Sequence, residues 1–109
     1  MGEYNKAIED FTSAINGNFA SYYLRGQCYA ILEQHDKAIE DFTAIVLCPN
    51  IISTEMTNVY LSRAWSYASL EHHDKAIEDY KKVIEITSNL DPKHEEEIKE
   101  YIKNNITIH

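Results

Sequence analysis

Residues 6–11 read KAIEDF, and the same six residues return at positions 37–42 and, with a final tyrosine, at positions 75–80. The second and third copies also share an upstream segment, because seven residues of the stretch 22–35 recur at the equivalent positions of the stretch 60–73. A block that recurs in this way is typical of proteins built by stacking repeated units. The sequence therefore predicts a repeat architecture.

Each unit is expected to form two α-helices. Tyr22, Gly26 and Tyr29 are spaced i, i+4 and i+7, which places them on one face of a first helix. The small residue in the middle lets a neighbouring helix come close. Ala38 and Phe42 begin the corresponding apolar face of a second helix. Neither helix can bury its apolar face alone, so the units must stack on one another.

The second helix of each unit is expected to begin at a polar residue. Asn5, Asp36 and Asp74 stand at equivalent positions just before the repeated block. Their side-chain oxygens can accept hydrogen bonds from the free amides of a first helical turn. We therefore predict that these three residues are N-caps.

The spacing of aromatic and small residues resembles the tetratricopeptide signature. The pattern is Y-x2-R-G-x2-Y at 22–29 with A-x3-F at 38–42, and Y-x2-R-A-x2-Y at 60–67 with A-x3-Y at 76–80. The resemblance covers residues 2–88. It implies an all-α fold, a right-handed superhelical solenoid of antiparallel helix pairs.

The chain is expected to form a single domain over residues 1–109. Its predicted parts are a half repeat at 3–16, full repeats at 20–48 and 54–88, and a C-terminal capping helix at 92–104. The final helix follows Asp91 and has Pro92 in its first turn, where the missing amide donor costs nothing. Glu95 and Lys99 are spaced to form an i,i+4 ion pair. The narrow apolar stripe of this helix indicates that it closes the solenoid.

Charge limits the kinds of partner that the protein can bind. Of its 109 residues, 18 are acidic and 10 are basic, and the formal net charge is −8. No cluster of lysine and arginine is present to contact nucleic acid or anionic lipid, so we expect neither nucleic-acid nor membrane binding. Complementarity favours a peptide or protein partner that is neutral or basic.

Residue types that carry catalysis are scattered rather than grouped. The two cysteines are too few for a disulfide framework or a four-ligand metal site, and the five histidines lack metal-binding spacing. No phosphate-binding loop or nucleophile motif is present. The sequence therefore predicts a protein that is not an enzyme and has no metal site or cofactor. Without a signal-peptide pattern or a long apolar run, a cytoplasmic location is expected.

The resemblance also implies where a partner binds, because tetratricopeptide solenoids use a concave surface lined by the first helix of each unit. The residues that we predict to bind the partner lie one position past the buried stripe of these helices: Tyr23, Gln27, Leu61 and Trp65. Trp65 is the only tryptophan in the chain, and an exposed aromatic side chain in a groove is a favoured anchor. The alternative is that Trp65 only packs on its own neighbours, Leu61 and Ser69.

Arginine and aspartate recur at fixed positions of the repeat. The recurring residues are Arg25 and Arg63, and Asp10, Asp41 and Asp79. One interpretation is a structural ion pair between helices of neighbouring units, which contributes little stability if it is exposed. The other is that an arginine binds a carboxylate of a ligand. The sequence leaves both open.

The first copy of the repeat consists of a second helix alone. Part of its apolar surface, formed by Ile8, Phe11 and Ile15, is therefore expected to be uncovered. This is unfavourable, because burying one such side chain contributes about 1.5–3 kcal/mol. We predict that a second copy of the chain covers this face, which gives a homodimer, or that a first helix outside this sequence does so.

The residues and the resemblance together predict a non-catalytic adaptor or scaffold that binds a peptide segment or a protein surface in a concave groove. Two alternatives stay open. The chain could be an assembly subunit that forms homo-oligomers through its exposed N-terminal helix face. It could also be a docking fragment of a larger protein.

Overall fold

The computed structural model describes residues 2–14, 19–48, 53–87 and 91–105. Most of these residues lie in α-helices, and no strand occurs among them. The helices in this part of the chain are α1 (Gly2–Ala14), α2 (Phe19–Ile31), α3 (His35–Val46), α4 (Ser53–Ser69), α5 (His73–Ile86) and α6 (Pro92–Asn105). The predicted all-α class is confirmed.

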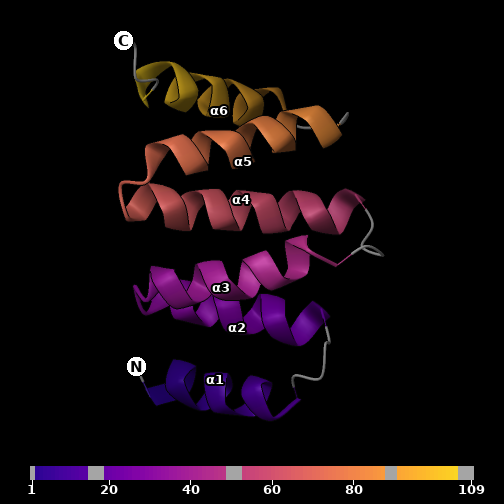
Figure 1. Ribbon diagram of the computed structural model, residues 1–109, viewed down its shortest axis with the longest axis vertical. Coiled ribbons are helices and arrows are strands. Elements are labelled where there is room, and N and C mark those ends of the chain that lie inside the picture. Colours follow the sequence, from indigo (N-terminus) through magenta and orange to yellow (C-terminus); the bar gives the residue numbers. More distant parts are fainter. Residues whose placement is uncertain (1, 15–18, 49–52, 88–90, 106–109) are drawn as a thin grey trace.

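The helices stack in chain order along the longest axis of the molecule, with α1 and α6 at opposite ends (Figure 1). Each helix runs antiparallel to the one before it and packs against it. The first helices of successive pairs, α2 and α4, also touch. The stack measures 43 × 28 × 25 Å. An elongated stack in which each helix contacts mainly its neighbours is a solenoid, as the repeat pattern predicts.

The turns inside the two helix pairs, α2–α3 and α4–α5, have the same conformation. Glu33 and Glu71 adopt the left-handed backbone conformation, with φ angles of 60° and 62°. In the first of these turns the amide of Gln34 donates to the carbonyl of Tyr29 at 2.8 Å, and the equivalent bond in the other turn measures 2.9 Å. These are the six-to-one bonds of a Schellman motif, which ends the first helix and reverses the chain.

This turn corrects the predicted starts of the second helices. α3 and α5 begin one residue before Asp36 and Asp74, and neither helix has a side-chain capping bond. α1 begins three residues before Asn5. The three predicted N-caps are therefore wrong. In α3 and α5 the helix starts earlier than predicted because the Schellman motif fixes where the second helix begins. Asp36 and Asp74 lie instead in the first turn, where their carboxylates complement the helix dipole.

The core of the α2–α3 pair is centred on Phe42, whose side chain is completely buried. The ring of Phe42 lies against Gly26 of α2, because a Cβ added to Gly26 would be 2.6 Å from Cε1 of the ring. In the next pair the position of Gly26 is taken by Ala64, which is also fully buried. The small residue therefore lets the two helices come close, as the sequence predicts.

Gly26→Ala is expected to destabilise the protein by about 1–3 kcal/mol, although alanine is the better helix former. The added methyl group would overlap the ring of Phe42, which is packed on all sides. Urea unfolding followed by circular dichroism measures the change in the free energy of unfolding. In a Phe42→Leu background the smaller side chain leaves room, so the same change should cost less. An equal cost in the two backgrounds would contradict this explanation.

Each helix pair contains a buried ion pair. Arg25 of α2 donates to both carboxylate oxygens of Asp41 in α3, at 2.8 and 2.6 Å. Arg63 of α4 donates in the same way to Asp79 in α5, with both bonds at 2.7 Å. Only 5% of each aspartate side chain is exposed. Each pair joins two helices of the same unit, which corrects the predicted pairing between neighbouring units.

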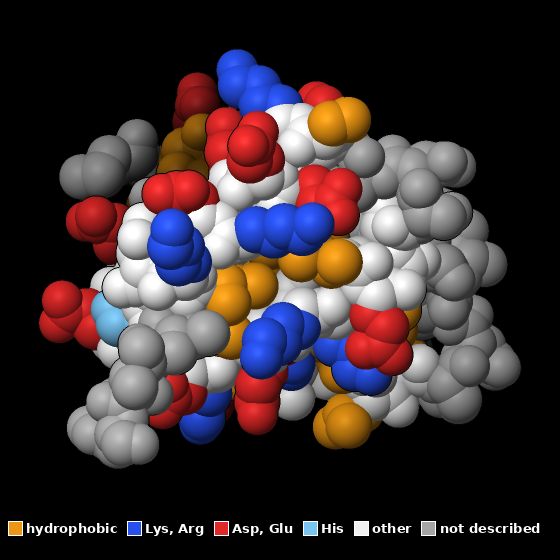
Figure 2. All heavy atoms as spheres, turned by 90° about the horizontal axis from the view of Figure 1, so that it is seen from above, with side chains coloured by type: hydrophobic (Ala, Val, Ile, Leu, Met, Phe, Trp, Pro, Cys, Tyr) orange, Lys and Arg blue, Asp and Glu red, His pale blue; other side chains and the backbone are white. Residues whose placement is uncertain are grey.

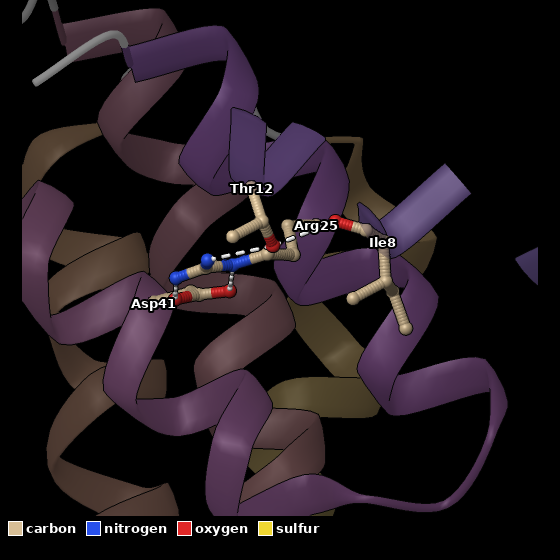
Figure 3. Close-up of polar contacts among 4 residues, drawn as sticks. All are labelled: Ile8, Thr12, Arg25 and Asp41. Carbon is tan, nitrogen blue, oxygen red and sulfur yellow. Dashed lines mark hydrogen bonds and ion pairs between the residues drawn. The ribbon is translucent and has the colours of Figure 1, made fainter. Parts of the chain in front are cut away.

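Each arginine also connects its helix pair to the preceding helix, as Figure 3 shows for Arg25. Arg25 donates from Nη1 to the hydroxyl of Thr12 in α1 at 3.1 Å, and Thr12 donates to the carbonyl of Ile8 at 2.7 Å. Arg63 makes the equivalent bond to Thr43 of α3 at 3.2 Å. Because a guanidinium holds its donors in one rigid plane, these bonds fix the orientation of three successive helices.

The last helix, α6, covers α5 with its narrow apolar stripe. Ile98 is buried, and the hydroxyl of Tyr101 is hydrogen-bonded to Nδ1 of His73 in α5 at 2.7 Å. Glu95 and Lys99 form the predicted i,i+4 ion pair at 3.3 Å. Seen from this end of the stack, charged side chains of both signs surround a smaller number of hydrophobic ones (Figure 2). The outer face of α6 is therefore suited to solvent.

Candidate functional site

A cleft of about 750 Å³ opens between the end of α2 and the end of α4. One wall is formed by α2 and the turn that follows it, and the other by the last turns of α4. We name it the Trp65 cleft. The lining residues that matter here are Ile31, Glu33, His35, Trp65, Ser69 and Leu70.

The Trp65 cleft exposes large apolar side chains. Ile31 and Trp65 are each 51% exposed, and Leu70 is 39% exposed. Single exposed apolar side chains are common on protein surfaces, but several of them gathered in one concave site indicate an interaction site. The aromatic ring of Trp65 offers the largest apolar area at the lowest cost in side-chain entropy.

Trp65 is held in place by a buried polar contact between α3 and α4. Its indole ring meets the imidazole of His35 edge-on, with 5.0 Å between ring centroids and an interplanar angle of 80°. Nδ1 of His35 is in turn hydrogen-bonded to the hydroxyl of Ser66 at 3.1 Å, and both residues are buried. The hydroxyl of Ser69 donates to the carbonyl of Trp65. The indole is thus supported on one side, while about half of Trp65 stays open to solvent.

The role of His35 was missed from the sequence, although a signal for it is present. His35 recurs as His73, and each histidine bonds to a residue of the next helix pair or of α6: Ser66 and Tyr101 respectively. The histidine at the first position of each second helix is therefore hydrogen-bonded to the helix that packs next in the stack. The recurrence points to this structural role, and in the case of His35 it also positions the tryptophan.

The other predicted partner-binding residues lie elsewhere. Tyr23 is partly buried and stacks on Phe19 with 5.9 Å between ring centroids. Gln27 donates from its side chain to the hydroxyl of Ser62 at 2.8 Å, which links α2 to α4. Leu61 is partly buried and lines a separate, smaller cavity next to α6. Of the four predicted residues, the structure brings only Trp65 to the Trp65 cleft.

Ile31 and Leu70 are cleft residues that sequence reasoning did not identify. Ile31 stands at the position where the next unit has Ser69, so the repeat itself does not require an apolar residue there. That difference between the copies is the signal that could have found it. Leu70, in contrast, has the same residue, Leu32, at the equivalent position of the other unit. The sequence therefore gives no sign that Leu70 is the exposed one of the two.

Three further features bear on metal binding, thiol reactivity and membrane insertion. Across 2–14, 19–48, 53–87 and 91–105, no group of three or more His, Cys, Asp or Glu side chains is arranged to hold a metal ion. Cys28 is buried, and the loss of solvation raises the pKa of its thiol above the ordinary value. In the same ranges no helix has both the length and the hydrophobicity needed to cross a bilayer.

The surface predicted for self-association is only partly described. Ile8 and Phe11 are each partly buried on α1, whereas Ile15 lies outside the described residues. The structure contains one chain, so the prediction of a homodimer stays a prediction.

Comparison with known protein families agrees with the repeat pattern. The family model of the tetratricopeptide repeat matches residues 19–46 and 57–90, which together make up more than half of the chain. A search of curated proteins gave no significant match. Repeats of this kind generally mediate protein–protein interactions and are typically non-catalytic. The chain, with its stacked helix pairs and its two matched repeats, belongs to the tetratricopeptide repeat family.

Proposed function

We propose that the protein is a non-catalytic adaptor or scaffold whose Trp65 cleft binds a segment of a partner protein. The observation that carries the proposal is a tryptophan that is half exposed yet held in place by the buried His35–Ser66 contact. A pre-positioned aromatic anchor loses little entropy on binding, which is why such residues dominate binding energies at interfaces.

The chemistry of the cleft defines the class of partner. Ile31, Trp65 and Leu70 favour an apolar side chain that inserts between them. The carboxylate of Glu33 lies at the same site, and the whole chain carries a net charge of −8. We therefore infer that the bound segment places a large apolar residue in the cleft and is neutral or basic around it. A longer segment would continue along the first helices toward the predicted groove residues Tyr23, Gln27 and Leu61.

Trp65→Ala is expected to weaken the binding of such a segment by about 30-fold, which corresponds to about 2 kcal/mol. Peptides selected from a displayed library against the wild-type protein supply the ligand, and titration calorimetry measures the dissociation constant for both proteins. Because Trp65 is the only tryptophan, its fluorescence also reports directly whether a peptide covers it.

Leu47→Ala is the matched control. Leu47 is 77% exposed at the end of α3 and does not line the Trp65 cleft, so its truncation removes exposed apolar area without touching the proposed site. This variant should bind the peptides as the wild type does. If Trp65→Ala instead lowers the melting temperature clearly and leaves the dissociation constant unchanged, Trp65 is a packing residue and the proposal is wrong.

A further inference from the structure

A second, smaller cavity of about 200 Å³ lies where α4, α5 and α6 meet. We name it the Tyr101 pocket. Its walls come from three helices of the stack, of which α5 packs against both of the others. The lining residues are Leu61 of α4, Tyr80 of α5, and His94, Glu97, Ile98 and Tyr101 of α6.

The Tyr101 pocket combines an aromatic and apolar interior with a carboxylate at its rim. Ile98 is buried and the rings of Tyr80 and Tyr101 are partly buried, whereas Glu97 is exposed. The two rings are in contact, with 5.1 Å between their centroids and an interplanar angle of 65°. Burial raises the pKa of both tyrosine hydroxyls above the ordinary value, so both phenols are neutral near pH 7. The negative charge of the pocket therefore comes from Glu97.

Elsewhere in this fold, tyrosine rings of the same kind are in contact with cations. Cζ of Arg25 lies 5.8 Å and Nζ of Lys37 lies 5.7 Å from the centroid of the Tyr29 ring. The ring of Tyr67 has the equivalent two contacts, at 5.6 and 5.7 Å. The electron-rich face of a tyrosine ring attracts a positive charge at such distances.

The Tyr101 pocket has the aromatic rings and a carboxylate, but its cation is missing. Within the ranges that the structure describes, no lysine or arginine lies over the ring of Tyr80 or Tyr101, and Glu97 forms no ion pair. Lysine and arginine side chains combine a long apolar stem with a charged end, which matches a pocket that is apolar inside and negative at its rim.

We propose, building on the function proposed above, that the Tyr101 pocket binds a lysine or arginine side chain of the same partner segment whose apolar residue enters the Trp65 cleft. The aliphatic stem of this side chain contacts Leu61. Its charged end lies against the rings of Tyr80 and Tyr101, within reach of the carboxylate of Glu97. The pocket thus adds a requirement for one basic residue at a defined place in the partner.

The positions of the two sites set the spacing between the two side chains. Leu61 of the pocket and Trp65 of the cleft are one turn apart on the same face of α4. The cleft lies on the α2 side of this helix and the pocket on the α6 side, so the width of one helix, about 10–12 Å, separates them. An extended segment rises about 3.3 Å per residue. The basic residue is therefore expected about three positions from the apolar one.

The test selects a displayed library of random peptides in parallel against the wild type, Glu97→Gln and Trp65→Ala. Peptides enriched by the wild type should share a large apolar residue and, about three positions away, a lysine or arginine. Selection on Glu97→Gln should keep the apolar residue and lose the basic one, and selection on Trp65→Ala should do the reverse. The two variants therefore test the pocket and the cleft separately.

An enriched peptide is then synthesised with its basic residue intact or replaced by an uncharged analogue of the same length, citrulline for arginine or norleucine for lysine. Titration calorimetry should show that the analogue binds the wild type at least fivefold more weakly. The unmodified peptide should bind Glu97→Gln at least fivefold more weakly than it binds the wild type. Combining the two changes should add little, because each removes the same contact.

Glu96→Gln is the matched control for charge. Glu96 is the adjacent acid on α6, is exposed and does not line the Tyr101 pocket. This variant should change the affinity for the unmodified peptide less than twofold. Melting curves of both glutamate variants should match that of the wild type, since both side chains are exposed.

Two results would overturn the proposal. One is an equal loss of affinity in Glu97→Gln and Glu96→Gln, which would indicate general charge attraction. The other is a wild-type selection without a shared basic residue, or an affinity that the uncharged analogue leaves unchanged. The pocket would then hold no basic side chain, whether it is empty or filled by another part of the polypeptide. A selection that depends on Glu97 but not on Trp65 would support the pocket and contradict only the function proposed for the Trp65 cleft.

Discussion

Asp79→Ala should lower the free energy of unfolding by about 3–5 kcal/mol, since it leaves the guanidinium of Arg63 buried without its counterion. Only 14% of the Arg63 side chain is exposed, and its two hydrogen bonds to Asp79 are both 2.7 Å long. Urea unfolding followed by far-ultraviolet circular dichroism measures the loss. Domains of this size are stable by only about 5–15 kcal/mol, so the variant should be close to unfolding at ambient temperature.

Two controls distinguish the effect of breaking a buried ion pair from the effect of removing a negative charge. Glu85→Ala removes one partner of the exposed Lys82–Glu85 pair, at 4.0 Å, and should cost less than about 1 kcal/mol. Arg63→Met combined with Asp79→Leu replaces the buried pair by apolar side chains and should be more stable than Asp79→Ala alone. If Asp79→Ala costs no more than Glu85→Ala, the buried pair does not hold these helices together.

Desolvation explains why the double replacement should be tolerated. Burial raises the pKa of the Asp79 carboxyl above its ordinary value, and the hydrogen bond and charge of Arg63 offset this only in part. Replacing both partners removes this desolvation cost together with the ion pair, so apolar side chains of similar size should be tolerated there. The pair also orients the helices, because the planar guanidinium bonds at once to Asp79 and to Thr43 of the preceding helix pair.

Phe42→Ala should cost about 3–5 kcal/mol in the free energy of unfolding. Phe42 is completely buried at the centre of the α2–α3 pair, and its ring fills the space that Gly26 leaves open. Its truncation leaves a cavity in the α2–α3 core, and Gly26, which faces it, has no side chain to fill it. The ring of Tyr23, whose centroid is 6.1 Å from that of Phe42, also loses a neighbour.

Thermal and urea unfolding of Phe42→Ala are compared with those of Leu24→Ala. Leu24 is a large apolar residue of α2 that is 44% exposed, so its truncation leaves no internal cavity and should cost less than about 1 kcal/mol. A Phe42→Ala variant as stable as Leu24→Ala would show that the core of this pair is not centred on Phe42.

The second helices show where local sequence is enough and where it is not. The spacing of Ala38 and Phe42 identifies the buried face correctly, because the period of an α-helix is a local property. The start of the same helix was placed wrongly, at Asp36. Its position depends on the left-handed backbone of Glu33, a residue type that seldom adopts this conformation and gives no sign of it in the sequence.

The arginine positions were found in the sequence, but their partners were not. Recurrence alone indicates that Arg25 and Asp41 belong to one structural element of the repeat. It does not say whether the pair lies within a unit or between units, because that depends on how the two helices cross. The crossing appears only in the tertiary structure, in which α2 and α3 approach closely where Gly26 meets the ring of Phe42.

The sequence by itself determined the helical repeat, the family, the buried face of the second helices and the one tryptophan worth testing. All of these follow from periodicity and residue type along the chain. Only the tertiary structure decided that Trp65 shares a cleft with Ile31 and Leu70, while Tyr23 and Gln27 make contacts inside the stack. The physical reason is that exposure depends on the distance and angle between neighbouring units, which many residues set together and no single motif encodes.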